Sequence, residues 1–199
     1  MSKKTVWNKG KVVGVKVPLS KEQVALVKMM LSEIGNLRDL ALFSLGVDTS
    51  LRACDLVALR VSDVLVDGEV VEVLSVLQKK TGLFVKCYLI PYTREVLKDF
   101  VRDKALDDFL FTGQKKTGLH ITAGTYRGLL KSWLLRAGID AFRYSTHSVR
   151  RTKPSFIYSK TQNLRACQKQ LGHSSIHNTQ NYLGIEEQEA LKIAKQWEI

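Results

Sequence analysis

The stretch LGHSSIHNTQNYLG, residues 171–184, places His173 and Tyr182 nine positions apart. A segment of helical pattern begins upstream at Asn163, a residue type that caps helices, and Gly172 is placed to close it. His173 therefore follows a helix terminus, where its side chain can point into a cleft, and Tyr182 lies on a following helix. The same sequence is also compatible with two ordinary polar surface residues. The rest of the chain has to show whether His173 and Tyr182 belong to a functional site.

The chain has 199 residues and is 45% hydrophobic, which suits one domain with a self-sufficient core. Charged residues interrupt every long apolar stretch, so we expect no membrane span. Residues 1–11 lack the apolar core and cleavage site of a secretory signal, which favours a cytoplasmic protein. Three widely spaced cysteines form no CxxC pair and are interpreted as reduced thiols in or near the core, not metal ligands: Cys54, Cys87 and Cys167.

The charge balance indicates a polyanionic partner. The sequence has 31 Lys and Arg against 19 Asp and Glu, a net charge of +12. Membrane-surface proteins gather basic residues on one face of an amphipathic helix, whereas here they are scattered along the chain, which favours nucleic acid. Residues 1–19 form a basic arm that carries Lys3, Lys4, Lys9, Lys11 and Lys16.

The pattern predicts a mainly α fold with a small three-stranded antiparallel β-sheet, an α+β class, over residues 20–199. Ser20 and Gln23 form a capping box at the first helix, and Asn36 starts a second helix that Gly46 is placed to end. Further helices are expected over 50–60, 93–104, 122–137, 146–159, 163–171 and 185–199. The three strands are expected over 64–66, 70–78 and 83–90, with turns at 67–68 and 79–82.

Cleavage of a DNA backbone without a metal requires cations for the non-bridging oxygens, an oxygen nucleophile and a proton for the leaving oxygen. THSVRR places His147 and Arg150 three apart, hence on one helix face. LRACDL supplies Arg52, with Asp55 one turn later as a carboxylate able to hold the arginine's orientation. KKTG can carry Lys80 in a β-turn to the edge of a bound duplex.

These segments, in this order, resemble the catalytic domain of the tyrosine recombinases of the phage integrase family. The resemblance covers residues 20–199 and rests on LRACDL, KKTG, THSVRR, LGH and the tyrosine nine positions after that histidine, followed by Leu-Gly. It implies the DNA breaking-rejoining fold, a double-stranded DNA substrate, and no metal or nucleotide cofactor. It also implies site-specific recombination, including DNA integration.

Carried over by position, the resemblance assigns Arg52 and Arg150 to the non-bridging oxygens of the scissile phosphate, with His173 as a third donor. Tyr182 would attack phosphorus, form a 3′-phosphotyrosine bond and release a 5′-hydroxyl, which conserves the bond energy for ligation.

The remaining roles follow in the same way. Lys80 would protonate the leaving oxygen, with the adjacent Lys79 as the alternative. His147 would help to deprotonate the tyrosine or order the site, and Asp55 would be supporting. Lys79, Arg151 and Arg165 are expected to contact DNA phosphates, or to be surface charges in the case of the two arginines.

The sequence departs from the family pattern in two places. Only some twenty residues precede the first helix, so the chain resembles a short form without the N-terminal core-binding domain. Pro154 lies four positions after Arg150 and removes a helical hydrogen bond, which should bend the helix beside the site. Such a bend could position Arg150 or spoil it.

Three functions remain open at this point. The first is a recombinase that self-associates on DNA, as dimer or tetramer, through the C-terminal helix 185–199. The second is a type IB topoisomerase-like enzyme with the same phosphotyrosine chemistry. The third is a catalytically weak DNA-binding regulator that retains the fold.

Overall fold

The computed structural model describes residues 16–113, 118–184 and 195, so the expected terminal helix 185–199 and most of the basic arm lie outside the described residues. The described helices, in chain order, are α1 (Lys21–Glu33), α2 (Leu37–Thr49), α3 (Ala53–Val57), α4 (Val61–Val64), α5 (Pro91–Val101), α6 (Ala123–Arg136), the 3-10 helix η1 (Ala141–Arg143), α7 (Thr146–Thr161), α8 (Leu164–Leu171) and α9 (Ile176–Leu183). The strands are β1 (Leu65–Val66), β2 (Glu69–Val70), β3 (Val73–Leu77) and β4 (Phe84–Tyr88).

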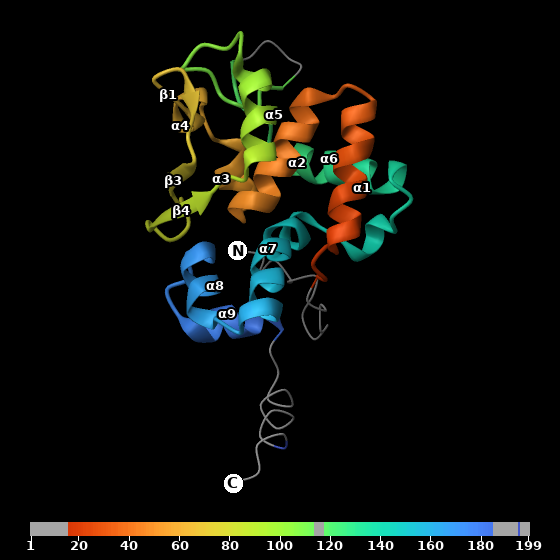
Figure 1. Ribbon diagram of the computed structural model, residues 1–199, viewed down its shortest axis with the longest axis vertical. Coiled ribbons are helices and arrows are strands. Elements are labelled where there is room, and N and C mark those ends of the chain that lie inside the picture. The colour runs from red at the N-terminus through yellow and green to blue at the C-terminus, as the bar shows by residue number, and fades with distance from the viewer. Residues whose placement is uncertain (1–15, 114–117, 185–194, 196–199) are drawn as a thin grey trace, which may run out of the picture.

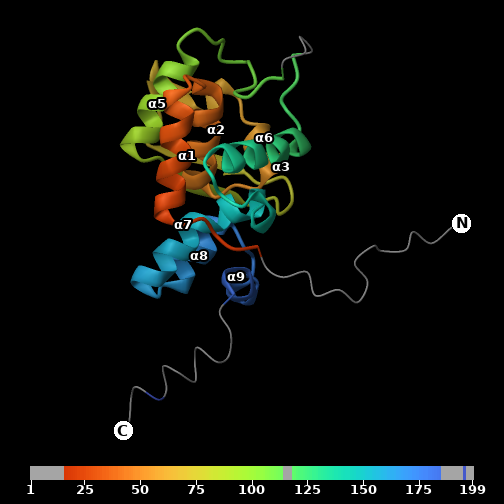
Figure 2. The same cartoon turned by 90° about the vertical axis from the view of Figure 1, so that its right-hand side faces the viewer.

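Helix α2 is the centre of the core. Every residue from Asp39 to Thr49 in α2 is buried, and the helix packs against α1, α5 and α7. Trp133 of α6 donates a 2.9 Å hydrogen bond from its indole to the buried carboxylate of Asp39. In both views α7, α8 and α9 lie together at one end of the molecule, beyond α1 and α2 (Figures 1 and 2). No helix of the described part is long and apolar enough to cross a membrane.

The caps predicted for the first two helices are confirmed, but the predicted end of the second helix is wrong. Ser20 and Gln23 form the expected capping box, and the Asn36 side chain caps α2. Gly46 does not end α2, which continues to a left-handed cap at Ser50 (φ 53°). A side chain on Gly46 would place its Cβ 2.9 Å from the Tyr126 hydroxyl oxygen, so this glycine serves close packing between α2 and α6.

The helix expected over 50–60 is also wrong, because Ser50 caps α2 and α3 spans only Ala53–Val57. The helix expected over 93–104 lies at Pro91–Val101.

The small antiparallel sheets confirm the predicted fold class, although the single three-stranded sheet is replaced by two hairpins. β1 pairs only with β2, and β3 pairs only with β4. The expected strand 70–78 is divided because its backbone changes partner at residues 71–72. The N–H of Val71 donates to Val64, whereas the carbonyl of Glu72 accepts from Leu89 on the other side.

Helix α7 runs unbroken through Pro154, from a Ser145 cap to Thr161. The Pro154 carbonyl accepts a hydrogen bond from the buried thiol of Cys167 on α8, so the proline lies where α7 and α8 pack together. All three cysteines are free, and Cys54 is the exposed one. The expected bend therefore does not interrupt the helix that carries Arg150.

Gly172 ends α8 with a φ of 64°, as the sequence predicts. An added Cβ would lie 2.5 Å from Cγ1 of Val85 and 2.8 Å from both polar side-chain atoms of Gln78. Only a glycine meets both requirements, the left-handed backbone and the space for its neighbours.

Gly172→Ala is expected to destabilise the protein more than Gly138→Ala, a control with φ 70° and open space around its Cβ. The control should lose about 1 to 2 kcal/mol from backbone strain, and Gly172→Ala about 1 to 3 kcal/mol more from the clash. Urea denaturation curves of the two variants measure the difference. Equal losses would show that the packing at Gly172 is not tight.

Candidate active site

Arg150 is buried on α7, and its side chain makes hydrogen bonds to the ends of two other helices. Its side chain donates to the carbonyl of Ser50 at the end of α2 (2.6 Å) and to that of Leu171 at the end of α8 (2.7 Å). Only 2% of the residue is exposed, and burial lowers the pKa of its guanidinium below the usual value. Carbonyl oxygens orient the guanidinium but do not neutralise it, so its charge remains available to an anion.

Arg52 approaches the same place from the start of α3. Its Nη1 donates to Oε1 of Gln78, and Nε2 of Gln78 donates to the Leu171 carbonyl at 3.1 Å. Arg52 and Arg150 are thus both connected to one carbonyl, which brings together two arginines 98 positions apart in the sequence. A pair of guanidinium groups around one point is suited to bind a phosphate.

Tyr182 of α9 lies against this cationic cluster. Its ring centroid is 4.7 Å from the Arg151 guanidinium and 5.8 Å from that of Arg150, and the ring of His173 meets it edge-on at 5.2 Å. The hydroxyl donates to the His147 carbonyl at 3.4 Å. Burial raises the pKa of Tyr182, and the neighbouring arginines oppose that shift.

The two histidines of the site are held in their neutral forms. Burial, and then the charges of Arg150 and Arg52, lower the pKa of His173 to about 4. Its Nδ1 lies 3.1 Å from Oγ1 of Thr179, which fixes the ring. Partial burial and the nearby arginines also lower the pKa of His147, although its side chain stays open to solvent.

Lys79 and Lys80 lie exposed in the turn between β3 and β4, as predicted. Asp55 holds this turn, because its Oδ1 accepts the backbone N–H of Lys79 at 3.0 Å. The backbone N–H of Asp55 donates to the Arg52 carbonyl at 2.9 Å, but within the described part of the chain no hydrogen bond or ion pair joins the Asp55 carboxylate to the Arg52 guanidinium. The expectation that Asp55 holds Arg52 directly is therefore wrong, and Asp55 contacts the lysine turn instead.

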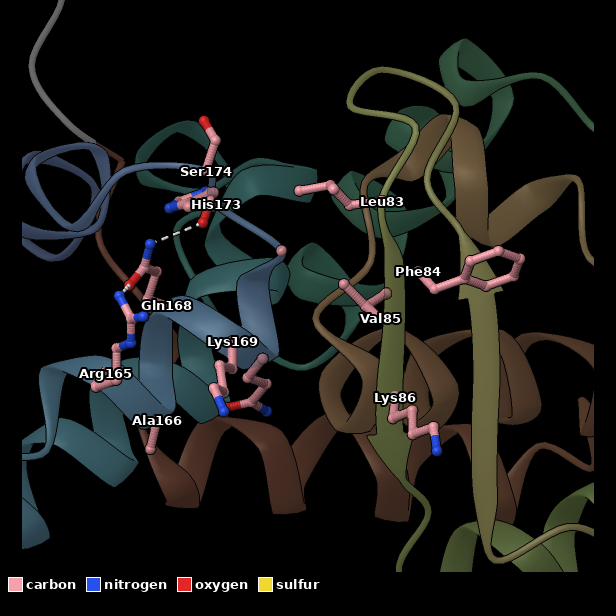
Figure 3. A pocket seen from close by; sticks show the side chains of 12 residues that line it. Leu83, Phe84, Val85, Lys86, Arg165, Ala166, Gln168, Lys169, His173 and Ser174 are labelled. Carbon is pink, nitrogen blue, oxygen red and sulfur yellow. Dashed lines mark hydrogen bonds between the residues drawn. The ribbon is translucent and has the colours of Figure 1, made fainter.

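The two remaining arginines lie in different surroundings. Arg151 is buried, 3% exposed, and donates to the Lys16 carbonyl at 2.7 Å. Its burial leaves little surface for the expected contact with a DNA phosphate, and it is not a surface charge, which was the alternative. Arg165 is exposed on α8 and donates to Gln168, which in turn donates to the His173 carbonyl (Figure 3). Arg165, but not Arg151, lines an open groove of about 690 Å³ between β4 and α8, together with Lys86, Lys169 and His173.

Sequence reasoning missed three residues that hold the site. Ser50 supplies a carbonyl to Arg150, Thr179 contacts His173, and Gln78 connects Arg52 to Leu171. Gln78 had a usable signal, because it continues the inward positions Leu74 and Val76 of β3 as a polar residue. Among the described residues, no group of three or more His, Cys, Asp or Glu could hold a metal ion.

The Phage integrase family matches residues 16–189 of the chain. The chain belongs to this family. It is 27% identical over 168 residues to the "Probable integrase/recombinase YoeC" of Bacillus subtilis, an alignment that covers 84% of this chain and 88% of that protein. It is 32% identical over 155 residues to tyrosine recombinase XerC of Neisseria gonorrhoeae, covering 75% of this chain and 48% of that protein. The chain thus spans about half the length of its Xer relatives.

Solved structures show the same fold. The crystal structure of XerA recombinase matches with a TM-score of 0.73 at 21% identity, covering 92% of this chain and 65% of that one. XerH bound to its difH substrate, in a pre-cleavage complex, matches with a TM-score of 0.73 at 21% identity, covering 92% and 55%. The family and the catalytic fold predicted from the sequence are confirmed, and the names of these relatives favour a recombinase over the topoisomerase and regulator alternatives.

His173 is expected to titrate near pH 4 in the free protein. In the unfolded chain the pKa of His173 is about 6.5. As the pH falls, this histidine is therefore protonated in the unfolded state before it is protonated in the folded state. His173 should therefore reduce stability progressively between about pH 6.5 and about pH 4. A titration of its ring protons by NMR measures the pKa, and His173→Gln should show a smaller loss of stability over that window. A midpoint near 6.5 in the folded protein would contradict the burial described here.

Proposed function

We propose that the protein is a site-specific DNA recombinase that cleaves and rejoins strands through a covalent 3′-phosphotyrosine intermediate. The observation that carries this proposal is the placement of Tyr182 against Arg150, with His173 at its ring and Arg52 connected to the same carbonyl. Family membership supplies the class of reaction, and this cluster supplies the groups that the reaction needs.

The scissile phosphate would bind where the two arginines converge. Arg52 and Arg150 would donate to its non-bridging oxygens, where charge develops in the transition state. His173 is neutral and keeps Nε2 directed away from Thr179, so with a proton on Nε2 it can donate a third hydrogen bond. Fixed donors of this kind need little reorganisation as the reaction proceeds.

Tyr182 Oη would then attack phosphorus as the P–O5′ bond breaks. The hydroxyl must lose its proton. It donates to the backbone carbonyl of His147, and the lowered pKa of that residue favours a neutral imidazole, which we propose accepts the proton. Lys80 would deliver a proton to the departing 5′-oxygen. Attack of a 5′-hydroxyl on the phosphotyrosine reverses every step and restores the DNA backbone.

Outside the reacting atoms, Lys79 and Arg165 are exposed and suited to contact neighbouring DNA phosphates. Self-association on DNA through residues 185–199 is part of the same proposal, supported by the apolar spacing of Leu191, Ala194 and Trp197. We place the reaction in the cytoplasm, in a compartment where the DNA substrate is accessible.

The function can be tested without knowing the target site. The protein is incubated with a library of duplexes of random sequence, each nicked on the 3′ side of a possible cleavage point so that the released fragment diffuses away. Complexes that survive detergent are recovered and sequenced. We expect the wild-type protein to form covalent adducts enriched in one inverted-repeat sequence.

Tyr182→Phe should abolish the adduct, since it removes only the attacking oxygen. Tyr92→Phe, an exposed tyrosine on α5, is the matched control and should leave the yield unchanged. Absence of any adduct from the wild-type protein, or an adduct that survives in Tyr182→Phe, would refute the proposal.

Lys80→Ala should slow cleavage by about 10²- to 10⁴-fold, as expected for loss of a general acid. The defect should nearly vanish on a duplex with sulfur in place of the bridging 5′-oxygen, because a thiolate leaves without protonation. Lys79→Ala is the control and should show little preference between the two substrates. If the sulfur substrate instead restored cleavage by Lys79→Ala and not by Lys80→Ala, the general acid would be Lys79.

A further inference from the structure

We infer that Gln78 is a positioning residue of this site. With a neutral side chain it fixes Arg52, and the turn that carries Lys79 and Lys80 (the lysine turn), relative to Arg150. The inference rests on the proposed function, because it concerns how the arginine pair meets a phosphate. Gln78 touches no reacting atom in this arrangement and acts through the residues that it holds.

The side-chain amide of Gln78 is fully buried, and both its oxygen and its nitrogen are hydrogen-bonded. Its Oε1 accepts from Arg52 and from the Thr81 hydroxyl at 3.1 Å, and its Nε2 donates to the Leu171 carbonyl at 3.1 Å. Two donors at one end and an acceptor at the other permit a single orientation of the amide. Gln78 therefore connects the arginine, the turn and the end of α8.

The backbone of Gln78 anchors the turn that carries Lys80. Its N–H donates to Leu83 and its carbonyl accepts from Gly82, both at 2.9 Å. The same residue thus closes the base of the lysine turn and fixes Arg52 with its side chain. The lysine and the arginine cannot shift independently while Gln78 stays in place.

Gly172 makes this arrangement possible from the opposite side. A Cβ there would lie 2.8 Å from the amide nitrogen and oxygen of Gln78. The absence of a side chain at Gly172 therefore leaves the space that the Gln78 amide occupies. Arg52 donates to the Gln78 amide, and Arg150 and that amide both donate to the Leu171 carbonyl. Lys80 lies in the turn that the Gln78 backbone closes, and His173 follows Gly172 directly in the chain.

The neutrality of Gln78 matters for catalysis. A carboxylate at this position would hold Arg52 equally well but would neutralise its charge before a phosphate arrived. The one hydrogen bond that the Arg52 guanidinium makes within the described residues is to this neutral oxygen, and the nearby carboxylate of Asp55 accepts from the turn instead. Arg52 is therefore held in place with its full charge available.

The test compares cleavage rates of Gln78→Met and Gln78→Glu with wild type, on the duplex recovered above and on the same duplex with a methylphosphonate at the cleavage point. Met keeps the length of the side chain and loses its polar contacts, whereas Glu keeps the acceptor and loses the donor and the neutrality. Both variants should cleave the normal duplex about 100-fold more slowly. Ser75→Ala, on the outward face of β3, is the control and should cleave normally.

The methylphosphonate separates positioning from a general structural role. It carries no negative charge, so a well-placed Arg52 contributes little to its cleavage. The defect of the variants should therefore be much smaller on this substrate, reduced to the part that comes from the lysine turn. A defect of the same size on both substrates would overturn the inference. Gln78→Glu keeps the contact to Arg52, so it serves as the test where Gln78→Met does not fold.

A second readout needs no cleavage at all. In the free wild-type protein, NMR of guanidinium groups labelled with ¹⁵N should show restricted rotation for both Arg52 and Arg150. Gln78→Met should release Arg52 and leave Arg150 restricted by Ser50. An unchanged Arg52 would refute the role of Gln78, and this result is independent of whether any covalent adduct forms.

Discussion

The guanidinium of Arg150 is buried between the end of α2 and the end of α8. It donates to one carbonyl at each helix end, that of Ser50 and that of Leu171. A buried charge is costly unless it is hydrogen-bonded, and these carbonyls orient the group without removing its charge. The interaction fixes α8 and α9 on the rest of the molecule. It therefore sets the position of His173 and Tyr182 as well as that of the arginine itself.

The polar residues around Arg150 preserve positive charge at this point. Gln78 holds Arg52 with a neutral oxygen, Asp55 is directed to the backbone of the lysine turn, and His173 is held neutral by burial and by the arginines. The cluster consequently favours an anion, and a phosphodiester is the anion that matches two planar guanidinium groups. Tyr182 lies against these arginines, and we propose that it attacks such a group.

Much of this arrangement could be predicted from the sequence, because it depends on local signals. The capping box at Ser20, the helix end at Gly172 and the turn that carries Lys80 each follow from the preferences of a few adjacent residues. The ordered motifs then identified the family and the positions of the candidate catalytic residues.

The errors concern contacts between distant segments, which local patterns do not report. Gly46 was read as a helix end, although it is a packing site for Tyr126, 80 positions away in the sequence. The sequence predicts one strand over 70–78 because β-branched residues run through it without a turn signal, whereas its hydrogen-bond partners change at residues 71–72. The sequence also predicts Arg151 as a DNA contact or a surface charge and gives no role to Gln78, because burial of a polar side chain depends on tertiary partners.

The central claim, that Tyr182 attacks a phosphate held by the arginines, is tested most directly by mass spectrometry of the covalent adduct. The adduct is trimmed with nuclease and protease, and the modified peptide is fragmented. The account predicts a nucleotide joined through its 3′-phosphate to Tyr182. A nucleotide on another residue, or one joined through its 5′-phosphate, would contradict it.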